Sequence, residues 1–279
     1  MTRRDLASSA AVLLIASPIV VGSLYAALAA VGLLGVGASG LTGAHVAAVL
    51  GSPTTWRGIA WTLTTAALAT TAAAAAAFMV AVRVHHSRVG RLLAVVPMAV
   101  PHVAAALAAL LLFAQSGWLS RMAHAAGLTS TPADFPVLVY DPAGVSLMVA
   151  FAWKEFPYLA LTAMAVLQGR STELEEAART LGATARQAFW RVTWPQLWRG
   201  SSPAVLAAFA FLVGQYEMPA LLAPSTPVAL PLLVYERSVD PDLARRGEAY
   251  VLALLALACC ALLVGAHGVW RHRISGDTR

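Results

Sequence analysis

Few side chains in this chain could do chemistry, and three of them interrupt long apolar stretches. Lys154, the only lysine, is followed directly by Glu155, and Glu217 follows Tyr216 in a later apolar stretch. Charged groups in lipid are costly unless they are paired or hydrated, so they often line a polar path. The alternative for Lys154 is a structural ion pair that fixes helix packing, with Glu217 as one candidate partner. We take Lys154, Glu155, Tyr216 and Glu217 as candidates for lining such a path.

The sequence lacks the residue patterns of common catalytic and metal sites. A phosphate-binding P-loop needs Gly-Lys-Ser or Gly-Lys-Thr, and here the single lysine precedes a glutamate. Neither the His-Glu-x-x-His pattern of zinc proteases nor Gly-x-Ser-x-Gly of acyl-transfer enzymes occurs. Cys259 and Cys260 are adjacent in an apolar stretch, which suits neither a metal site nor a disulfide framework. We therefore expect no catalytic site, metal or cofactor in this chain, and any energy must come from a partner or a gradient.

The composition indicates an integral membrane protein. Hydrophobic residues make up 59% of the 279 positions and charged residues only 11%, whereas soluble domains average about 25% charged residues. The formal charge of +6 is explained by arginines that flank membrane spans rather than by nucleic-acid binding. Because helices satisfy their own backbone hydrogen bonds in lipid, the expected fold is all-α.

Stretches with few or no charges predict six membrane-spanning helices in a single domain over residues 1–279. Each stretch reaches the roughly 20 residues needed to cross the hydrocarbon layer. The first is about twice as long as the apolar core of a signal peptide, so we expect it to be kept as a span. Pro97 and Pro101 are expected to bend the third span. The expected spans are residues 6–34, 58–82, 92–114, 144–168, 202–223 and 249–270.

The distribution of arginine predicts that both termini face the cytoplasm. In that orientation 13 arginines lie on the inner side and 4 on the outer side, as the positive-inside rule requires. The inner arginines are Arg3, Arg4, Arg83, Arg88, Arg91, Arg170, Arg179, Arg186, Arg191, Arg199, Arg271, Arg273 and Arg279, and the outer ones are Arg121, Arg237, Arg245 and Arg246. The outer segments 115–143 and 224–246 are rich in proline, and we expect the first to be irregular with one short helix.

The predicted cytoplasmic loop at residues 169–201 carries two short expected helices. Thr172 and Glu175 have the spacing of a capping box at the start of the first helix. Gly182 would end that helix in a left-handed conformation, and a second helix is expected at about residues 184–192. Such a loop could insert into a groove on a partner protein. Alternatively, it could lie on the lipid surface with its tryptophans at the interface.

This loop resembles the signature loop of the permease subunits of type I ABC importers. The family pattern is Glu-Ala-Ala, three residues, Gly, nine residues, an aliphatic residue, one residue, a leucine position and Pro. The matching residues are Glu176, Ala177, Ala178, Gly182, Val192 and Pro195. Trp194 departs from the pattern at the leucine position. In that family the loop forms a coupling helix that seats in a cleft of the ATP-hydrolysing subunit, so the resemblance implies an ATPase-coupling role for the matching residues.

The resemblance covers most of the chain and implies a larger assembly. The chain would be one of two permease subunits, identical or homologous, in a bacterial inner membrane. Its partners would be a cytoplasmic subunit that binds ATP and magnesium and an extracytoplasmic solute-binding protein, with no nucleic acid. The pattern from Gly214 to Leu222 is similar to that of polyamine, thiamine and ferric-ion permeases. The alternative is a secondary transporter driven by protons through Glu155 or Glu217, against which the lack of an internal repeat argues.

Overall fold

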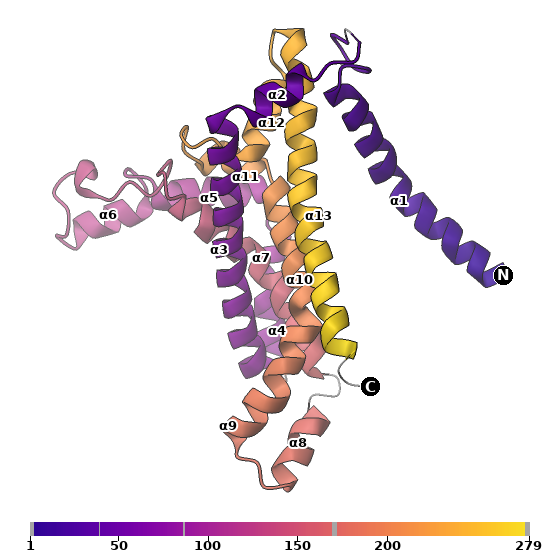
Figure 1. Ribbon diagram of the computed structural model, residues 1–279. Coiled ribbons are helices and arrows are strands. Elements are labelled where there is room, and N and C mark those ends of the chain that lie inside the picture. Colours follow the sequence, from indigo (N-terminus) through magenta and orange to yellow (C-terminus); the bar gives the residue numbers. More distant parts are fainter. Residues whose placement is uncertain (1–2, 39, 86, 169–171, 277–279) are drawn as a thin grey trace. The chain divides into compact units, whose positions relative to one another are not determined.

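The computed structural model describes residues 3–38, 40–85, 87–168 and 172–276 (Figure 1). Helices joined by turns and short loops make up this part of the chain, and no strand occurs in it. The expectation of an all-α fold is therefore confirmed for the described residues.

Five helical segments of the described chain are long and apolar enough to cross a membrane. They are Leu13–Ala30, Pro53–Val84, His102–Ala125, Ala185–Gly214 and Leu243–Arg271. The span expected at residues 144–168 corresponds to α7 (Val145–Val166), which is not among the five. Lys154 and Glu155 in its middle make α7 less apolar. A count of six spans and the cytoplasmic placement of both termini therefore stay predictions.

The chain packs as two compact units. One unit consists of Met1–Ile59 and Leu230–Arg279, and the other consists of Ala60–Ala229. The long helix α3 (Pro53–Val84) begins in the first unit and continues in the second. The expected single domain over residues 1–279 stays a prediction.

The unit of the two terminal segments is organised around the last helix. In it, α13 (Arg246–Gly276) packs against α1 (Arg3–Ala30), α2 (Ala44–Leu50) and α12 (Leu230–Ser238). The short helix η5 (Leu243–Arg245) leads into α13. The rings of Tyr25 and Tyr250 join α1 to α13 edge to face, with centroids 5.8 Å apart. Such aromatic pairs contribute about 0.5–1.5 kcal/mol beyond the area that they bury.

A network of ion pairs holds the start of α13 to the end of α12. Arg237 and Arg245 each lie within 3.1–3.8 Å of both Asp240 and Glu248. Isolated surface ion pairs contribute little, but a network of partly buried ones contributes more. This network gives the expected outer segment 224–246 a defined structure despite its prolines.

The second unit, Ala60–Ala229, contains the remaining helices. They are α4 (Arg88–Val95), η1 (Val96–Ala99), α5 (His102–Phe113), α6 (Trp118–Ala125), η2 (Pro132–Asp134), α7, α8 (Thr172–Thr180), α9 (Ala185–Ala188), η4 (Phe189–Thr193), α10 (Trp194–Gly214) and α11 (Glu217–Leu222). Its core is rich in alanine, with Ala73, Ala77 and Ala81 of α3 buried in one cluster with Ala160 and Ala163 of α7. Small side chains let helix backbones approach closely, which is typical of packing in membranes.

The third expected span, residues 92–114, is interrupted rather than bent. The helix formed by α4 and η1 ends at Ala99, Val100 is extended with φ −80° and ψ 124°, and α5 starts at His102. The proline at position 101 causes the interruption, because its ring excludes the preceding residue from helical geometry and it has no N–H to donate.

The fifth expected span, residues 202–223, has different limits in the structure. One helical segment runs from Ala185 through η4 and α10 to Gly214, so the expected separate helix at 184–192 forms its first turns. The segment continues past Pro195, which comes directly after the π-helical stretch η4. The chain then leaves helical geometry at Gln215, and α11 forms a separate short helix.

Candidate functional site

The first arm of the predicted coupling loop is the helix α8, which contains Glu176, Ala177 and Ala178. Gly182 follows it with φ +92°. The N–H of Gly182 donates to the carbonyl of Arg179 over 3.0 Å, and the N–H of Ala183 donates to that of Ala178 over 3.0 Å. This pair of bonds is the Schellman arrangement, which needs a left-handed residue. The expected helix end at Gly182 is confirmed, whereas residues 169–171 of the predicted loop lie outside the described residues.

The second arm begins at Thr184 with a capping box that the sequence analysis did not identify. The N–H of Thr184 donates to Oε1 of Gln187 over 2.9 Å, and the N–H of Gln187 donates to Oγ1 of Thr184 over 3.3 Å. The threonine and glutamine three residues apart are the usual signature of this motif. The two arms, α8 and α9, form a hairpin that extends away from the helices of this unit (Figure 1).

A side-chain bond joins the two arms at the base of this hairpin. The hydroxyl of Thr193, at the end of η4, donates to Oε2 of Glu175 over 2.7 Å. Thr193 is 5% exposed. Because the side chain of Thr172 lies outside the described ones, the capping box expected between Thr172 and Glu175 stays a prediction.

Aromatic side chains anchor the second arm to α3. The ring of Trp194 lies 6.1 Å from that of Phe78, 6.4 Å from Phe189 and 5.6 Å from Trp190, measured between centroids. Trp198 packs edge to face on the same Phe78 at 6.4 Å. The tryptophan that departs from the family pattern is therefore the centre of an aromatic cluster at the base of the hairpin.

The remaining predicted coupling residues lie along the same hairpin. Val192 and Pro195 are half-buried, in η4 and in the first turn of α10. Glu176 and Ala177 are exposed, Ala178 is half-buried, and the side chain of Leu181 at the tip is 89% exposed. Nothing lies within 4 Å of the position where a Cβ on Gly182 would stand.

Lys154 lies in α7 and is 7% exposed. Its Nζ donates to the carbonyl of Val100 over 2.6 Å and to that of Pro97 over 3.1 Å. In the ion pairs of the described residues, the cations are Arg237 and Arg245 only. Glu217 is therefore not an ion-pair partner of Lys154, and that interpretation was wrong. The proline break leaves carbonyls exposed, and Lys154 binds these instead.

The other predicted path residues lie apart from this contact. Glu155 is 7% exposed within α7. Tyr216 and Glu217 lie at the interruption between α10 and α11, where Tyr216 is 37% exposed. Since α11 packs against α5, the two interrupted helices meet in one region of this unit. His102, at the start of α5, lies within electrostatic range of Lys154 and Glu217.

The sequence analysis did not select His102 as a path residue. Its ring lies 5.3 Å from that of Phe211, measured between centroids. A signal was present, because a histidine directly follows Pro101 in an apolar stretch. Transporters often bind or gate solutes where membrane helices are discontinuous.

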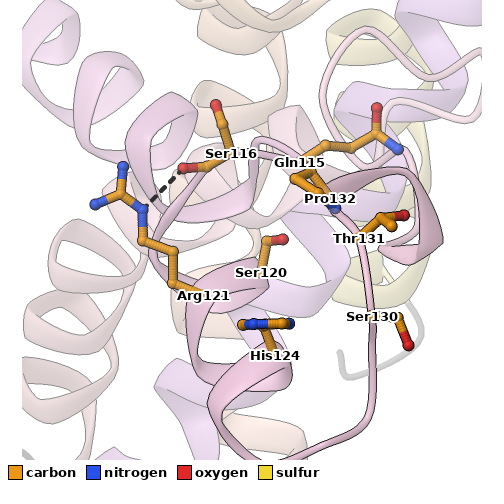
Figure 2. A pocket seen from close by; sticks show the side chains of 8 residues that line it. All are labelled: Gln115, Ser116, Ser120, Arg121, His124, Ser130, Thr131 and Pro132. Carbon is orange, nitrogen blue, oxygen red and sulfur yellow. Dashed lines mark hydrogen bonds between the residues drawn. The ribbon is translucent and has the colours of Figure 1, made fainter.

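The predicted outer segment 115–143 contains a surface pocket of about 350 Å³. Its lining residues are Gln115, Ser116, Ser120, Arg121, His124, Ser130, Thr131 and Pro132 (Figure 2). Nε of Arg121 donates to the carbonyl of Ser116 over 3.2 Å. Beside the pocket, the carboxylate of Asp134 accepts hydrogen bonds from the N–H groups of Thr131 and Ser130, which hold the pKa of Asp134 below its usual value. The expected short helix of this segment is confirmed as α6.

Long apolar helices, interrupted spans and an exposed hairpin define an integral membrane transport component. The chain belongs to the family described as binding-protein-dependent transport system inner membrane component, which matches residues 76–275. This membership confirms the predicted class and its location in an inner membrane.

Curated relatives include permeases of two transport systems. The chain is 29% identical over 184 residues to the sulfate transport system permease protein CysT of Synechocystis sp., and this match covers 65% of the chain and 61% of that relative. It is 31% identical over 193 residues to the molybdenum transport system permease protein ModB of Mycobacterium tuberculosis, covering 68% and 67%. The chain thus matches less than two thirds of the length of CysT. The expected likeness to polyamine, thiamine and ferric-ion permeases stays a prediction.

A solved structure shows the same fold over nearly the whole chain. It is a chain of the bacterial alginate ABC transporter in complex with alginate pentasaccharide-bound periplasmic protein. The TM-score is 0.70 at 18% identity, and the match covers 97% of this chain and 93% of that one.

Proposed function

We propose that this chain is the membrane-spanning permease subunit of an ATP-driven solute importer. The observation that carries the proposal is the hairpin around Gly182, which combines the family's signature residues with an exposed apolar tip. A cytoplasmic ATPase would dock on this hairpin, and a second permease subunit would complete the path. An extracytoplasmic solute-binding protein would deliver the solute to the outer segments. The chain itself would hydrolyse nothing and bind no cofactor.

The charge of α8, although not that of the whole loop 169–201 with its five arginines, supports docking on a protein rather than on the lipid surface. The helix α8 contains Glu173, Glu175 and Glu176 but only Arg179 as a cation. The cytoplasmic leaflet is negatively charged and attracts basic segments. An acidic helix with an exposed leucine beside it fits a protein groove better, because apolar anchors at the centre of an interface contribute most of the binding energy.

We propose that Tyr216 and Glu217 line the translocation path. Ionisable residues within membrane segments usually face a water-filled cavity or the interior of a helix bundle. Glu217 is exposed on this single chain, and so is Phe211 beside His102. A second subunit or a hydrated path would therefore cover this face. Lys154 would support the path by holding backbone carbonyls, and Glu155 stays a candidate path residue.

The names of the relatives make sulfate and molybdate the first solutes to test. Solute uptake should be measured in proteoliposomes that contain this chain, its ATPase partner and its binding protein. Uptake that requires ATP and survives a protonophore would support the importer. Uptake that a proton gradient drives without ATP would instead favour the secondary transporter, for which the buried carboxylate of Glu155 is the supporting observation.

A further inference from the structure

The break before α5 leaves backbone carbonyls at the end of a half-span. The half-span formed by α4 and η1 ends at Ala99. Pro101, two residues later, has no N–H that could donate to a carbonyl of the preceding turn. Unpaired carbonyls in a membrane interior are costly, so such breaks persist only where another group binds them.

Lys154 binds two of them, of which the carbonyl of Pro97 also accepts from the N–H of Val100 over 3.3 Å. It comes from α7, 54 residues beyond Val100, and its Nζ donates to the carbonyls of Pro97 and Val100. A cation at the carboxyl end of a helix is stabilised by the partial negative charge there. The only lysine of the chain is thus used to attach the end of the half-span to α7.

A second attachment lies at the other end of the half-span. Nε2 of Gln168, two residues beyond α7, donates over 3.0 Å to the carbonyl of His85 in the turn before α4. Between the two attachments, α4 packs along α7, and Ala94 is buried in one cluster with Leu159 and Ala160.

The two attachments follow opposite chain directions. Lys154 and Gln168 lie 14 positions apart, which is about 21 Å of helix. Lys154, the earlier of the two, bonds to Pro97 and Val100, whereas Gln168, the later one, bonds to the earlier residue His85. The half-span and α7 are therefore joined antiparallel.

We infer that Lys154 and Gln168 are positioning residues that make α4, η1 and α7 move as one lever. The lever runs from Gln168 to the break at Val100 and to His102 beyond it, and the coupling hairpin follows Gln168 in the chain after residues 169–171. The part of this inference that concerns coupling rests on the proposed function. The part that concerns rigidity does not, so the two can fail separately.

Rigidity is tested on the purified full-length chain in lipid nanodiscs by amide hydrogen exchange. Lys154→Met removes the donor to the carbonyls of Pro97 and Val100 at similar side-chain volume. Gln168→Leu likewise removes the donor to the carbonyl of His85 at similar side-chain volume. Exchange at residues 98–103 should rise at least tenfold in Lys154→Met, and exchange at residues 85–91 should rise in Gln168→Leu. Lys154→Arg, which keeps donors, should restore protection. Unchanged exchange in both loss variants would overturn the lever.

Coupling is tested in proteoliposomes with the ATPase and the binding protein, as solute transported per ATP hydrolysed. The matched control is Thr162→Val, because Thr162 lies on α7 but bonds only within its own helix, to the carbonyl of Tyr158. We expect both loss variants to hydrolyse ATP while transporting severalfold less solute per ATP, with the control at the wild-type ratio. Ratios equal to those of the control would show that the attachments only stabilise the fold.

Discussion

Thr193 donates its hydroxyl hydrogen to Glu175 over 2.7 Å and so closes the hairpin at its base. The two residues belong to different arms and lie 18 positions apart in the chain. The bond fixes the angle between α8 and the helix that continues into α10. A load applied to α8 would therefore reach α10.

Removing this bond should loosen the hairpin. Glu175→Ala would leave the buried hydroxyl of Thr193 unpaired, at a cost of about 1–3 kcal/mol. Amide exchange at residues 185–193 should rise, and ATPase-coupled uptake should fall. Glu175→Gln keeps an acceptor oxygen and should behave nearly as wild type. Equal protection of residues 185–193 in wild type and Glu175→Ala would contradict this role.

The conformation of Gly182 allows a second prediction, which distinguishes backbone strain at this residue from steric exclusion of its side chain by the partner. A branched residue at φ +92° is strained by about 1–2 kcal/mol, whereas asparagine tolerates this region. Because the space around the missing Cβ is open, Gly182→Asn should keep uptake and Gly182→Val should lose it. Co-purification of the ATPase measures docking directly. Loss of docking in both variants would show that the partner excludes any side chain at this position.

Much of this architecture could be predicted because lipid imposes simple rules on sequence. The flanking arginines Arg57, Arg83 and Arg271 lie within about a turn and a half of the ends of α3 and α13, although α3 starts five residues earlier than expected and α13 ends six residues later. Gly182 was predictable because a left-handed helix end selects glycine. The capping box of Thr184 and Gln187 was equally visible in the sequence but was not used.

Two features could not be read from the pattern of residues. The partner of Lys154 is a pair of carbonyls, which every residue possesses, so no side-chain pattern points to them. The helix continues across Pro195 directly after the π-helical stretch η4, whose wider hydrogen-bond pattern no apolar stretch predicts.

Glu217 provides a test of the path that is independent of the hairpin. The residue is exposed on this chain, so Glu217→Gln should leave the free energy of unfolding within about 0.5 kcal/mol of wild type. If Glu217 lines the path, the rate or the KM of uptake should change. Thermal unfolding and uptake kinetics are measured on the same preparation. Wild-type kinetics in a correctly folded Glu217→Gln protein would remove Glu217 from the path.

The outer segment should lose local order only at acid pH. The N–H groups of Thr131 and Ser130 stabilise the charged form of Asp134, so its pKa is lower when the segment is folded than when it is not. The stabilisation is therefore fully present above the unfolded pKa of about 4, and it disappears as the pH falls through the lower pKa of the folded state.

The fluorescence of Trp118, in the neighbouring helix α6, would report this change, together with amide exchange at residues 128–134. Both should be constant from neutral pH down to about pH 4 and change below it. Asp134→Asn removes the charge that these N–H groups stabilise, so its profile should be flat over the same range, with faster exchange throughout. A wild-type transition at near-neutral pH would mean that a group other than Asp134 controls the segment.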